Sequence, residues 1–239
     1  MEELSRLEIR VVPGESPDDP QVVLLIGGRD LLSGDGHRGF GPESLLHRGD
    51  PLTPASPPRR VVLYHCGCGV AGCSGRACTI SESYGVVRWS GFRRFVGLDH
   101  PLDQTLSDEH GRPDHLPDIA FAAAQYRAEV ARAKQDRSWE TRRRRLARLL
   151  TTRLAAETDR WAELGVEFRS AWLWGDDEET YAINLRRQGD QLLIAIRAEQ
   201  SPDDEAVVNA MATHVLAGDE RTWSVIYDQR RPSLPPDPL

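Results

Sequence analysis

The sequence predicts an α+β protein with two folded parts. Near the N-terminus, several short segments alternate apolar and polar residues, which is the period of a half-buried strand. Helical patterns occupy the middle of the chain, and the C-terminal part returns to alternating segments around one more helix. We therefore predict a β-rich domain over residues 1–98, a linker over 99–118, an α+β domain over 119–230 and a disordered tail over 231–239.

The first domain is expected to hold a small antiparallel sheet with a cysteine-rich loop. Residues 7–11 and 21–26 predict a hairpin whose second strand is apolar on both faces, and a short helix is expected at 42–46. A strand over 60–64 then runs into the cysteine loop, and a hairpin over 77–90 follows it. The loop therefore joins successive strands of one sheet.

Two helices are predicted in the middle of the chain. The first spans 122–135, and the second begins near Ser138, which is a good N-cap residue. Apolar residues recur along one side of the second helix: Trp139, Leu146, Leu149, Leu150, Leu154 and Trp161. This helix is therefore expected to pack against a large apolar surface.

The C-terminal segments predict a β-β-β-α-β layer with helices on one face. The first strand is expected to place these residues on a single face: Val166, Phe168, Ser170, Trp172 and Trp174. Alternation continues over 181–185 and 192–196, which makes three antiparallel strands in succession. A helix then starts at Ser201-Pro202 and ends at Gly218, before a last strand over 223–227.

All four cysteines lie close together, in the order Cys66, Cys68, Cys73 and Cys78, with His65 immediately before the first. Clustered thiolates repel one another unless a cation neutralises them, so the spacing favours a structural zinc site, with His65 as an alternative ligand. The glycines of the loop allow it to curl tightly: Gly67, Gly69, Gly72 and Gly75. A glycine-rich turn with unliganded thiols and an iron–sulfur or reversible disulfide centre remain alternatives.

Aromatic and basic residues alternate around Trp89, Phe92, Arg93 and Arg94, as they do in platforms that bind single-stranded nucleic acid. We favour the alternative that the two rings seal the sheet while the arginines are solvated. A net charge of −7 also argues against general binding to nucleic acid or to an anionic membrane. Residues 137–160 hold eight arginines against three acids. We expect a mostly solvated basic face there, and docking to the acidic remainder of the chain or to an acidic partner is the alternative.

The chain is expected to be a cytoplasmic protein. No stretch approaches the roughly 20 consecutive apolar residues that a membrane span needs. The N-terminal sequence is acidic and lacks the apolar run of a secretory signal, so we expect a reducing compartment and no permanent disulfide.

The cysteine loop and its flanks resemble a group of uncharacterised actinobacterial proteins with a Cys-Gly-Cys-Gly-x-x-Gly-Cys loop between strands. The resemblance covers roughly residues 21–150 and is seen in Tyr64-His65-Cys66-Gly67-Cys68-Gly69-Val70-Ala71-Gly72-Cys73, in Val87-Arg88-Trp89, in Gln125-Tyr126-Arg127-Ala128-Glu129-Val130 and in Arg137-Ser138-Trp139-Glu140. It implies no catalytic residues, because the group has no established activity. It also implies that Cys78 is not a regular member of the motif.

We predict a non-enzymatic protein-interaction module with an unknown protein partner and a structural zinc site. An immunity or antitoxin-like protein, which masks a basic partner by charge and shape, is one alternative. A metal-dependent nucleic-acid binder and an unrecognised enzyme are the others. The enzyme alternative would need the thiolates, the acids around Asp176-Asp177-Glu178-Glu179 or the histidines of the linker, yet no nucleophile–base pair is evident among them.

Overall fold

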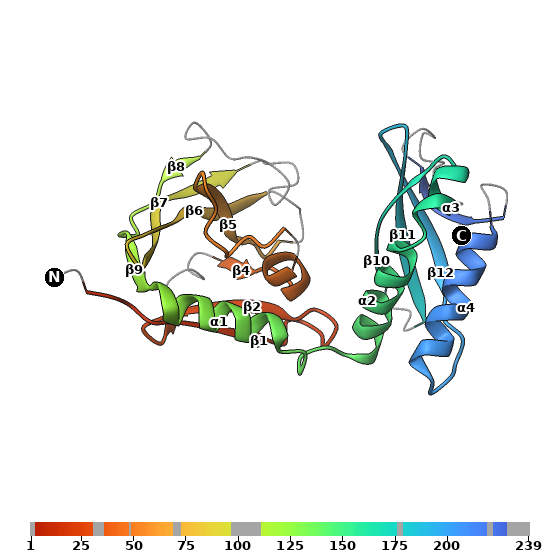
Figure 1. The fold of residues 1–239 in the computed structure, drawn as a ribbon, viewed down its shortest axis with the longest axis horizontal. Coiled ribbons are helices and arrows are strands. Elements are labelled where there is room, and N and C mark those ends of the chain that lie inside the picture. The colour runs from red at the N-terminus through yellow and green to blue at the C-terminus, as the bar shows by residue number, and fades with distance from the viewer. Residues whose placement is uncertain are drawn as a thin grey trace. The chain divides into compact units, whose positions relative to one another are not determined.

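The computed structural model describes residues 3–30, 36–47, 49–68, 73–96, 111–175, 179–218 and 222–228. The chain divides into two compact units, Met1–Trp139 and Glu140–Leu239 (Figure 1). Both units combine antiparallel sheets with helices, so the predicted α+β class is confirmed. Within the described ranges, every helix is too short or too polar to cross a bilayer.

The first unit contains two antiparallel sheets and two helical segments. One sheet has the order β1-β2-β3, and the other has the order β4-β5-β6-β7-β8 with β9 also paired to β7. The elements are β1 (Leu7–Val12), β2 (Gln21–Ile26), β3 (Arg29–Asp30), β4 (His37–Gly39), η2 (Glu43–His47), β5 (Arg59–Cys66), β6 (Ser74–Ser83), β7 (Val86–Val96), β8 (Arg112–Pro113), β9 (Ile119–Ala122) and α1 (Ala123–Gln135). The strands, the short helix and the long helix predicted for this region are all present.

The two sheets of this unit are joined by hydrogen bonds and share one core. The Ser5 amide donates to the Ala120 carbonyl at 2.8 Å, and the Val22 amide donates to the Phe40 carbonyl at 2.9 Å. Side chains of α1 complete the outer edge of β1: Gln125 bonds both the amide and the carbonyl of Leu7, and Glu129 accepts from the Ile9 amide at 2.7 Å. An otherwise open strand edge is thereby satisfied by a helix.

This packing moves the boundary between the units. We predicted a linker over 99–118 and a second domain that starts at 119, but β9 pairs with β7 and α1 buries Tyr126 and Val130 in the core of the first unit. The predicted boundary is therefore wrong, and the division falls between Trp139 and Glu140. Helix α1 has one apolar face, and that face could cover a sheet of either unit. Its sequence alone therefore does not say to which unit it belongs.

The second unit is a single antiparallel sheet with helices packed on one face. Its strands lie in the order β10-β11-β12-β13. The elements are α2 (Arg142–Ala155), α3 (Thr158–Glu163), β10 (Glu167–Leu173), β11 (Thr180–Arg187), β12 (Asp190–Arg197), α4 (Asp204–Ala217) and β13 (Ser224–Asp228). The core joins leucines of α2 and valines of α4 to alternate residues of β11 and β12. The predicted β-β-β-α-β layer is confirmed.

Two details of this unit differ from the prediction. The helix begins after Thr141, whose hydroxyl accepts from the Arg144 amide at 3.3 Å, and Trp161 belongs to the separate helix α3. In β10, a bulge between Phe168 and Ser170 breaks the alternation. Phe168 therefore stacks on Trp161 in the helix-facing core, with ring centroids 5.6 Å apart, while Trp172 lies opposite Ala182 on the other face.

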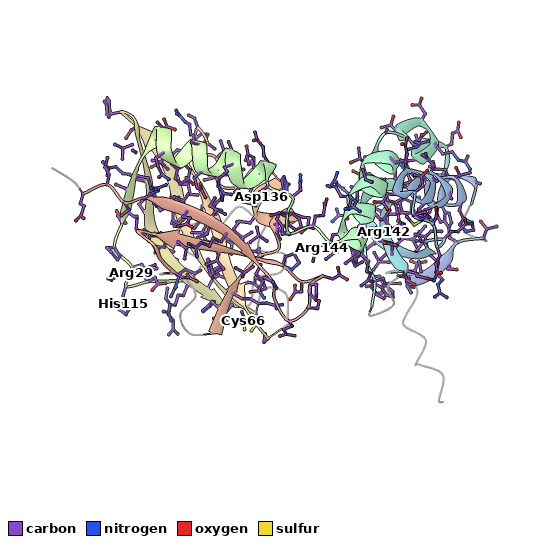
Figure 2. The ribbon with its side chains drawn as sticks, turned by 90° about the horizontal axis from the view of Figure 1, so that it is seen from below. Arg29, Cys66, His115, Asp136, Arg142 and Arg144 are labelled. Carbon is purple, nitrogen blue, oxygen red and sulfur yellow. The ribbon has the colours of Figure 1, made fainter. Side chains whose placement is uncertain are left out.

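The arginines of α2 are partly exposed, and several of them also pair with acids of their own unit. Asp204 at the start of α4 binds Arg142 at 2.8 Å and Arg145 at 2.7 Å. Figure 2 labels Arg142 on α2. Burial acts to raise the pKa of Asp204, but the two guanidinium groups outweigh it and hold that pKa below its usual range. Arg148 similarly binds Glu140 at 2.7 Å. The arginine run thus joins α2 to α4.

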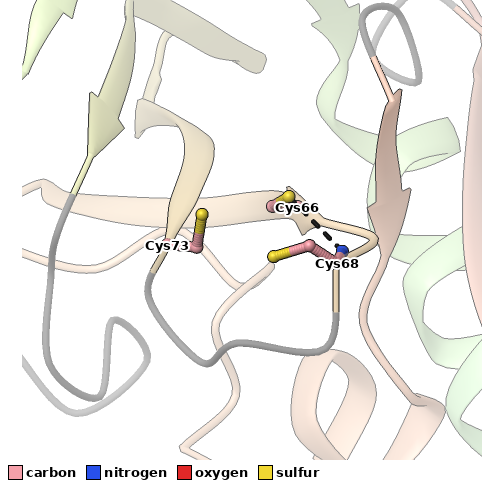
Figure 3. A group of neighbouring side chains, drawn as sticks. All are labelled: Cys66, Cys68 and Cys73. Atoms are coloured by element: carbon pink, nitrogen blue, oxygen red, sulfur yellow. Dashed lines mark hydrogen bonds between the residues drawn. The ribbon is translucent and has the colours of Figure 1, made fainter.

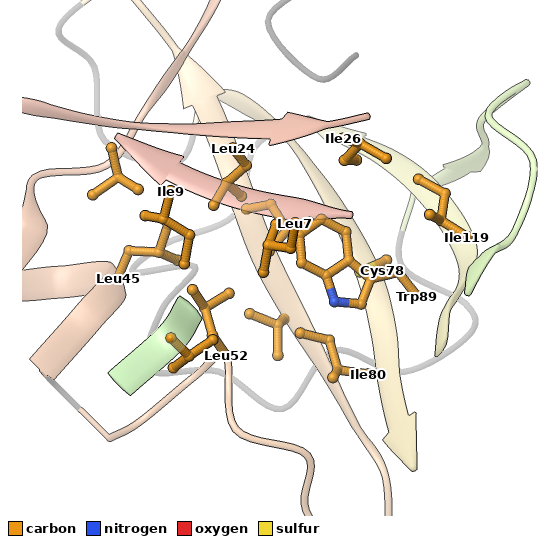
Figure 4. Close-up of a cluster of buried hydrophobic side chains, with 14 of the residues drawn as sticks. Leu7, Ile9, Leu24, Ile26, Leu45, Leu52, Cys78, Ile80, Trp89 and Ile119 are labelled. Carbon is orange, nitrogen blue, oxygen red and sulfur yellow. The ribbon is translucent and has the colours of Figure 1, made fainter. Parts of the chain in front are cut away.

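A buried hydrogen-bond chain holds α1 against the core of the first unit. Figure 4 shows Trp89 inside a cluster that includes Leu7, Leu52 and Ile80. The indole Nε1 of Trp89 donates to the Tyr126 hydroxyl at 3.1 Å, and that hydroxyl donates to the Leu52 carbonyl at 2.7 Å. All polar atoms in this chain are therefore satisfied without water.

Removal of the Tyr126 hydroxyl should destabilise the first unit. Tyr126→Phe leaves the Trp89 indole and the Leu52 carbonyl unpaired in the core, which is expected to lower the free energy of unfolding by about 1–3 kcal/mol. Urea unfolding monitored by fluorescence measures the change. Tyr84→Phe is the control, since Tyr84 is fully exposed at a turn and its loss should stay within about 0.5 kcal/mol. Equal stability of the two variants would contradict the role of the chain.

Candidate metal centre

Three of the cysteines come together at one end of the β5–β6 hairpin. Cys66 is the last residue of β5, Cys68 lies in the turn and Cys73 directly precedes β6. Their sulfur atoms all lie within 4.8 Å of one another (Figure 3). No disulfide joins the cysteines that the structure describes. The structure therefore presents a group of three thiols that could hold a metal ion.

The strand ladder brings these sulfurs together. Antiparallel pairing of β5 with β6 continues as far as His65 opposite Gly75, so the two ends of the loop start side by side. At Gly75 a β-carbon would lie 2.3 Å from the Phe95 ring and 2.6 Å from the Tyr64 carbonyl oxygen, so this glycine is required for close approach. The Cys68 amide also donates to the Cys66 sulfur at 3.4 Å, which keeps Cys68 close to Cys66.

Without a metal, the Cys73 thiol holds its proton. Hydrogen bonds with the thiols of Cys68 and Cys66 raise the pKa of Cys73 to about 11. A thiol with such a pKa is almost entirely protonated at neutral pH and is a poor nucleophile. A divalent cation reverses this preference because it stabilises the thiolate directly.

The donor set suits a soft or borderline metal. In a tetrahedral zinc site with Zn–S bonds of about 2.3 Å, sulfurs lie roughly 3.8 Å apart, so the observed group needs only a small contraction to bind an ion. Cys68 is exposed and the other two thiols are half-buried, so an ion has access from solvent. Three protein thiolates leave one position of a tetrahedron for a further ligand.

Cys78 does not join this group, which corrects the predicted set of four cysteine ligands. It lies within β6, roughly 16 Å along the strand from the loop at about 3.3 Å per residue. Its side chain is fully buried beside Ile80 and Trp89, and this burial strongly raises its pKa (Figure 4). Cys78 is therefore an apolar core residue.

His65, the predicted alternative ligand, also lies outside the group. Neighbouring residues of a strand point to opposite faces, so its side chain is directed away from that of Cys66. The His65 ring packs on Phe40 with centroids 4.5 Å apart, and its Nδ1 lies 2.9 Å from the Cys66 carbonyl oxygen. Burial lowers the pKa of this imidazole.

The residues considered for nucleic-acid binding do not form the exposed aromatic and basic platform that this hypothesis requires. Trp89 and Phe92 are only 0% and 3% exposed, so neither ring presents a face to a base. Arg93 donates to the Gly111 carbonyl at 3.1 Å, and Arg94 lies 3.3 Å from the Asp114 carboxylate. The rings seal the sheet, as we favoured.

The buried partner of Arg94 was missed from the sequence. Asp114 lay among the polar residues of the predicted linker, but its carboxylate is buried and binds Arg76 at 2.6 Å. Burial opposes the charge on Asp114, yet Arg76 and Arg94 keep its pKa below the usual range. His115 is exposed, whereas His100, His110 and the acids Asp176, Asp177 and Glu178 lie outside the described residues.

Comparisons of the chain with protein-family models, with curated proteins and with solved structures find no match. The function is therefore inferred from the geometry of the chain itself.

Zinc affinity should rise steeply with pH. Each thiol must lose its proton to bind, and Cys73 stays protonated well above neutrality, so binding releases protons and is favoured as the pH rises. Between about pH 6 and about pH 8, the apparent affinity is expected to increase at least about tenfold per pH unit. Competition with a chromophoric chelator, corrected for the chelator's own titration, measures this dependence. An affinity independent of pH would show that the thiols are not the ligands.

Proposed function

We propose that Cys66, Cys68 and Cys73 form a structural zinc centre in a non-enzymatic protein that works by binding another protein. The proximity of three thiols at one hairpin end is the observation that supports the metal. Zinc is favoured over an iron–sulfur cluster, because clusters commonly take four cysteines, whereas structural zinc also occurs with three cysteines and one histidine. A reducing compartment such as the cytoplasm would keep these thiols available.

A structural role fits the position of the thiols better than a catalytic one. They join the end of β5 to the start of β6, so a bound ion would close the loop between two strands of the main sheet. The raised pKa of Cys73 disfavours a free thiolate that could attack a substrate. Because the first unit also has an extensive apolar core, the ion would stabilise the end of the β5–β6 hairpin rather than create the fold.

Support for an interaction role comes from β13 in the second unit. This strand pairs with β12 and, among the described residues, with no other strand. Its side chains Val225, Ile226 and Tyr227 are 37%, 37% and 45% exposed. An edge strand with exposed apolar residues can accept an extended segment of another chain as an added strand. We therefore propose that a partner protein docks along β13 in this way.

Purified protein should contain one zinc ion per chain, bound at the three thiols. A Cys66→Ser, Cys68→Ser double variant should lose the metal and also the stabilisation it gives, which is about 4 kcal/mol when free zinc exceeds Kd about a thousandfold. Elemental analysis and thermal unfolding with and without a chelator measure both effects. Cys78→Ala is the control, since it removes a buried thiol but should keep the zinc. A wild-type protein that binds no zinc after reconstitution under reducing conditions would refute the centre.

Charge placed on β13 should block partner binding. Ile226→Lys puts an ammonium group where an added strand would pack, and partner affinity is expected to fall about tenfold or more. Affinity capture from the native cell, followed by calorimetry with the purified partner, compares the variant with the wild type. Ala210→Lys adds the same charge to an exposed position of α4 and should bind normally. Equal binding by both variants would exclude β13 as the docking edge.

A further inference from the structure

His37 occupies the strand position directly opposite Cys66. In the ladder between β4 and β5, His37 pairs with Cys66, Arg38 with His65 and Gly39 with Tyr64. Directly opposed residues of an antiparallel pair project to the same face, with β-carbons about 4.5–5.5 Å apart. The Gly67 amide donates to the Gly36 carbonyl at 3.1 Å, so the pairing continues past Cys66 into the cysteine loop. The register therefore places His37 on the same face as Cys66, at the end of the sheet where the three thiols lie.

The His37 ring extends from β4 across β5 to β6. Its Nε2 lies 3.4 Å from the hydroxyl oxygen of Ser74, the residue that directly follows Cys73. One end of the side chain thus opposes Cys66, and the other end reaches the neighbour of Cys73. An imidazole nitrogen is consequently present at the same edge of the sheet as the three sulfurs.

We propose that His37 is the fourth ligand of the metal centre, which would make it a tetrahedral Cys3His site. This inference depends on the proposed zinc centre and adds the ligand that its three thiols lack. The neutral imidazole donates a lone pair from a ring nitrogen, at a typical Zn–N distance of about 2.0–2.1 Å, while each thiol releases one proton. The ring nitrogens are not part of the group of ligand atoms within 4.8 Å, so metal binding would require the ring to leave its contact with Ser74 and move toward the sulfurs.

The face of the sheet to which each side chain projects distinguishes His37 from His65, the histidine next to Cys66 in sequence. His65 pairs with Arg38, so both side chains lie on the face opposite to that of Cys66 and His37. The ring of His65 packs on Phe40 there. The two histidines therefore form a matched pair for experiment: both are close to Cys66, but the register directs only His37 toward the thiols.

A fourth ligand on β4 would change what the metal holds together. The three thiols alone connect β5 with β6 across the loop. With His37 the ion would also fix β4, which in this sheet pairs only with β5 among the described strands. The centre would then join three consecutive strands at one end of the sheet.

Cobalt titration under reducing conditions tests this inference. Co²⁺ replaces zinc in tetrahedral sites, and its visible bands and thiolate charge-transfer absorption report the ligand set. We expect His37→Ala to lower Co²⁺ and Zn²⁺ affinity by at least about tenfold and to alter the visible bands. Mutation of a residue that only supports a ligand already costs about tenfold or more in metal affinity, so the loss of a ligand should cost at least as much. His65→Ala should keep the wild-type spectrum and affinity. His37→Cys should restore tight binding with stronger charge-transfer absorption, because a fourth thiolate replaces the imidazole.

Two failures are distinguishable. A wild-type protein that binds neither ion would overturn the zinc centre itself and this inference with it. Binding by His37→Ala with wild-type affinity and spectrum would overturn only the role of His37. Circular dichroism and melting of the metal-free proteins identify a folding defect in His37→Ala, and His37→Cys then decides the question, since only a residue that faces the ion can add a thiolate to its spectrum.

Discussion

The antiparallel ladder between β5 and β6 is the constraint on which the rest of the first unit depends. It places Cys66 and Cys73 at the same end of two neighbouring strands, and farther along it buries Val61, Val62 and Cys78 in the core. The ladder needs Gly75, since any larger residue there would collide with the Phe95 ring and the Tyr64 carbonyl. The loop glycines were expected to act through backbone flexibility. Gly75 is instead required because the space at this position has no room for a side chain.

Periodicity predicted most of the strands and helices because it is a local property of each segment. It could not assign segments to a unit, since the stripe of α1 would suit either core, and side-chain hydrogen bonds from Gln125 and Glu129 to β1 decide the matter. Alternation also fails wherever a bulge intervenes. The bulge after Phe168 places that ring against Trp161. The sequence of β10 does not predict this bulge.

The candidate site was predictable to the extent that it is local. Cys66, Cys68 and Cys73 are close in sequence, so one tight turn is enough to bring them together. Cys78 is also near in sequence, but it lies within an extended strand, where each further residue moves the side chain away from the turn. His37 could not be found in this way, because only the register of β4 against β5 places it opposite Cys66.

The same register connects the candidate metal site to the core. Tyr64 lies two residues before Cys66 and therefore projects to the same face of β5. Its hydroxyl accepts from the Leu24 amide at 3.0 Å and lies 3.2 Å from the Asp30 carboxylate, so it joins β5 to the other sheet of the unit. An ion that fixes the end of β5 would thus hold a strand that already connects both sheets. Its effect on stability is for this reason expected to extend beyond the loop into the core.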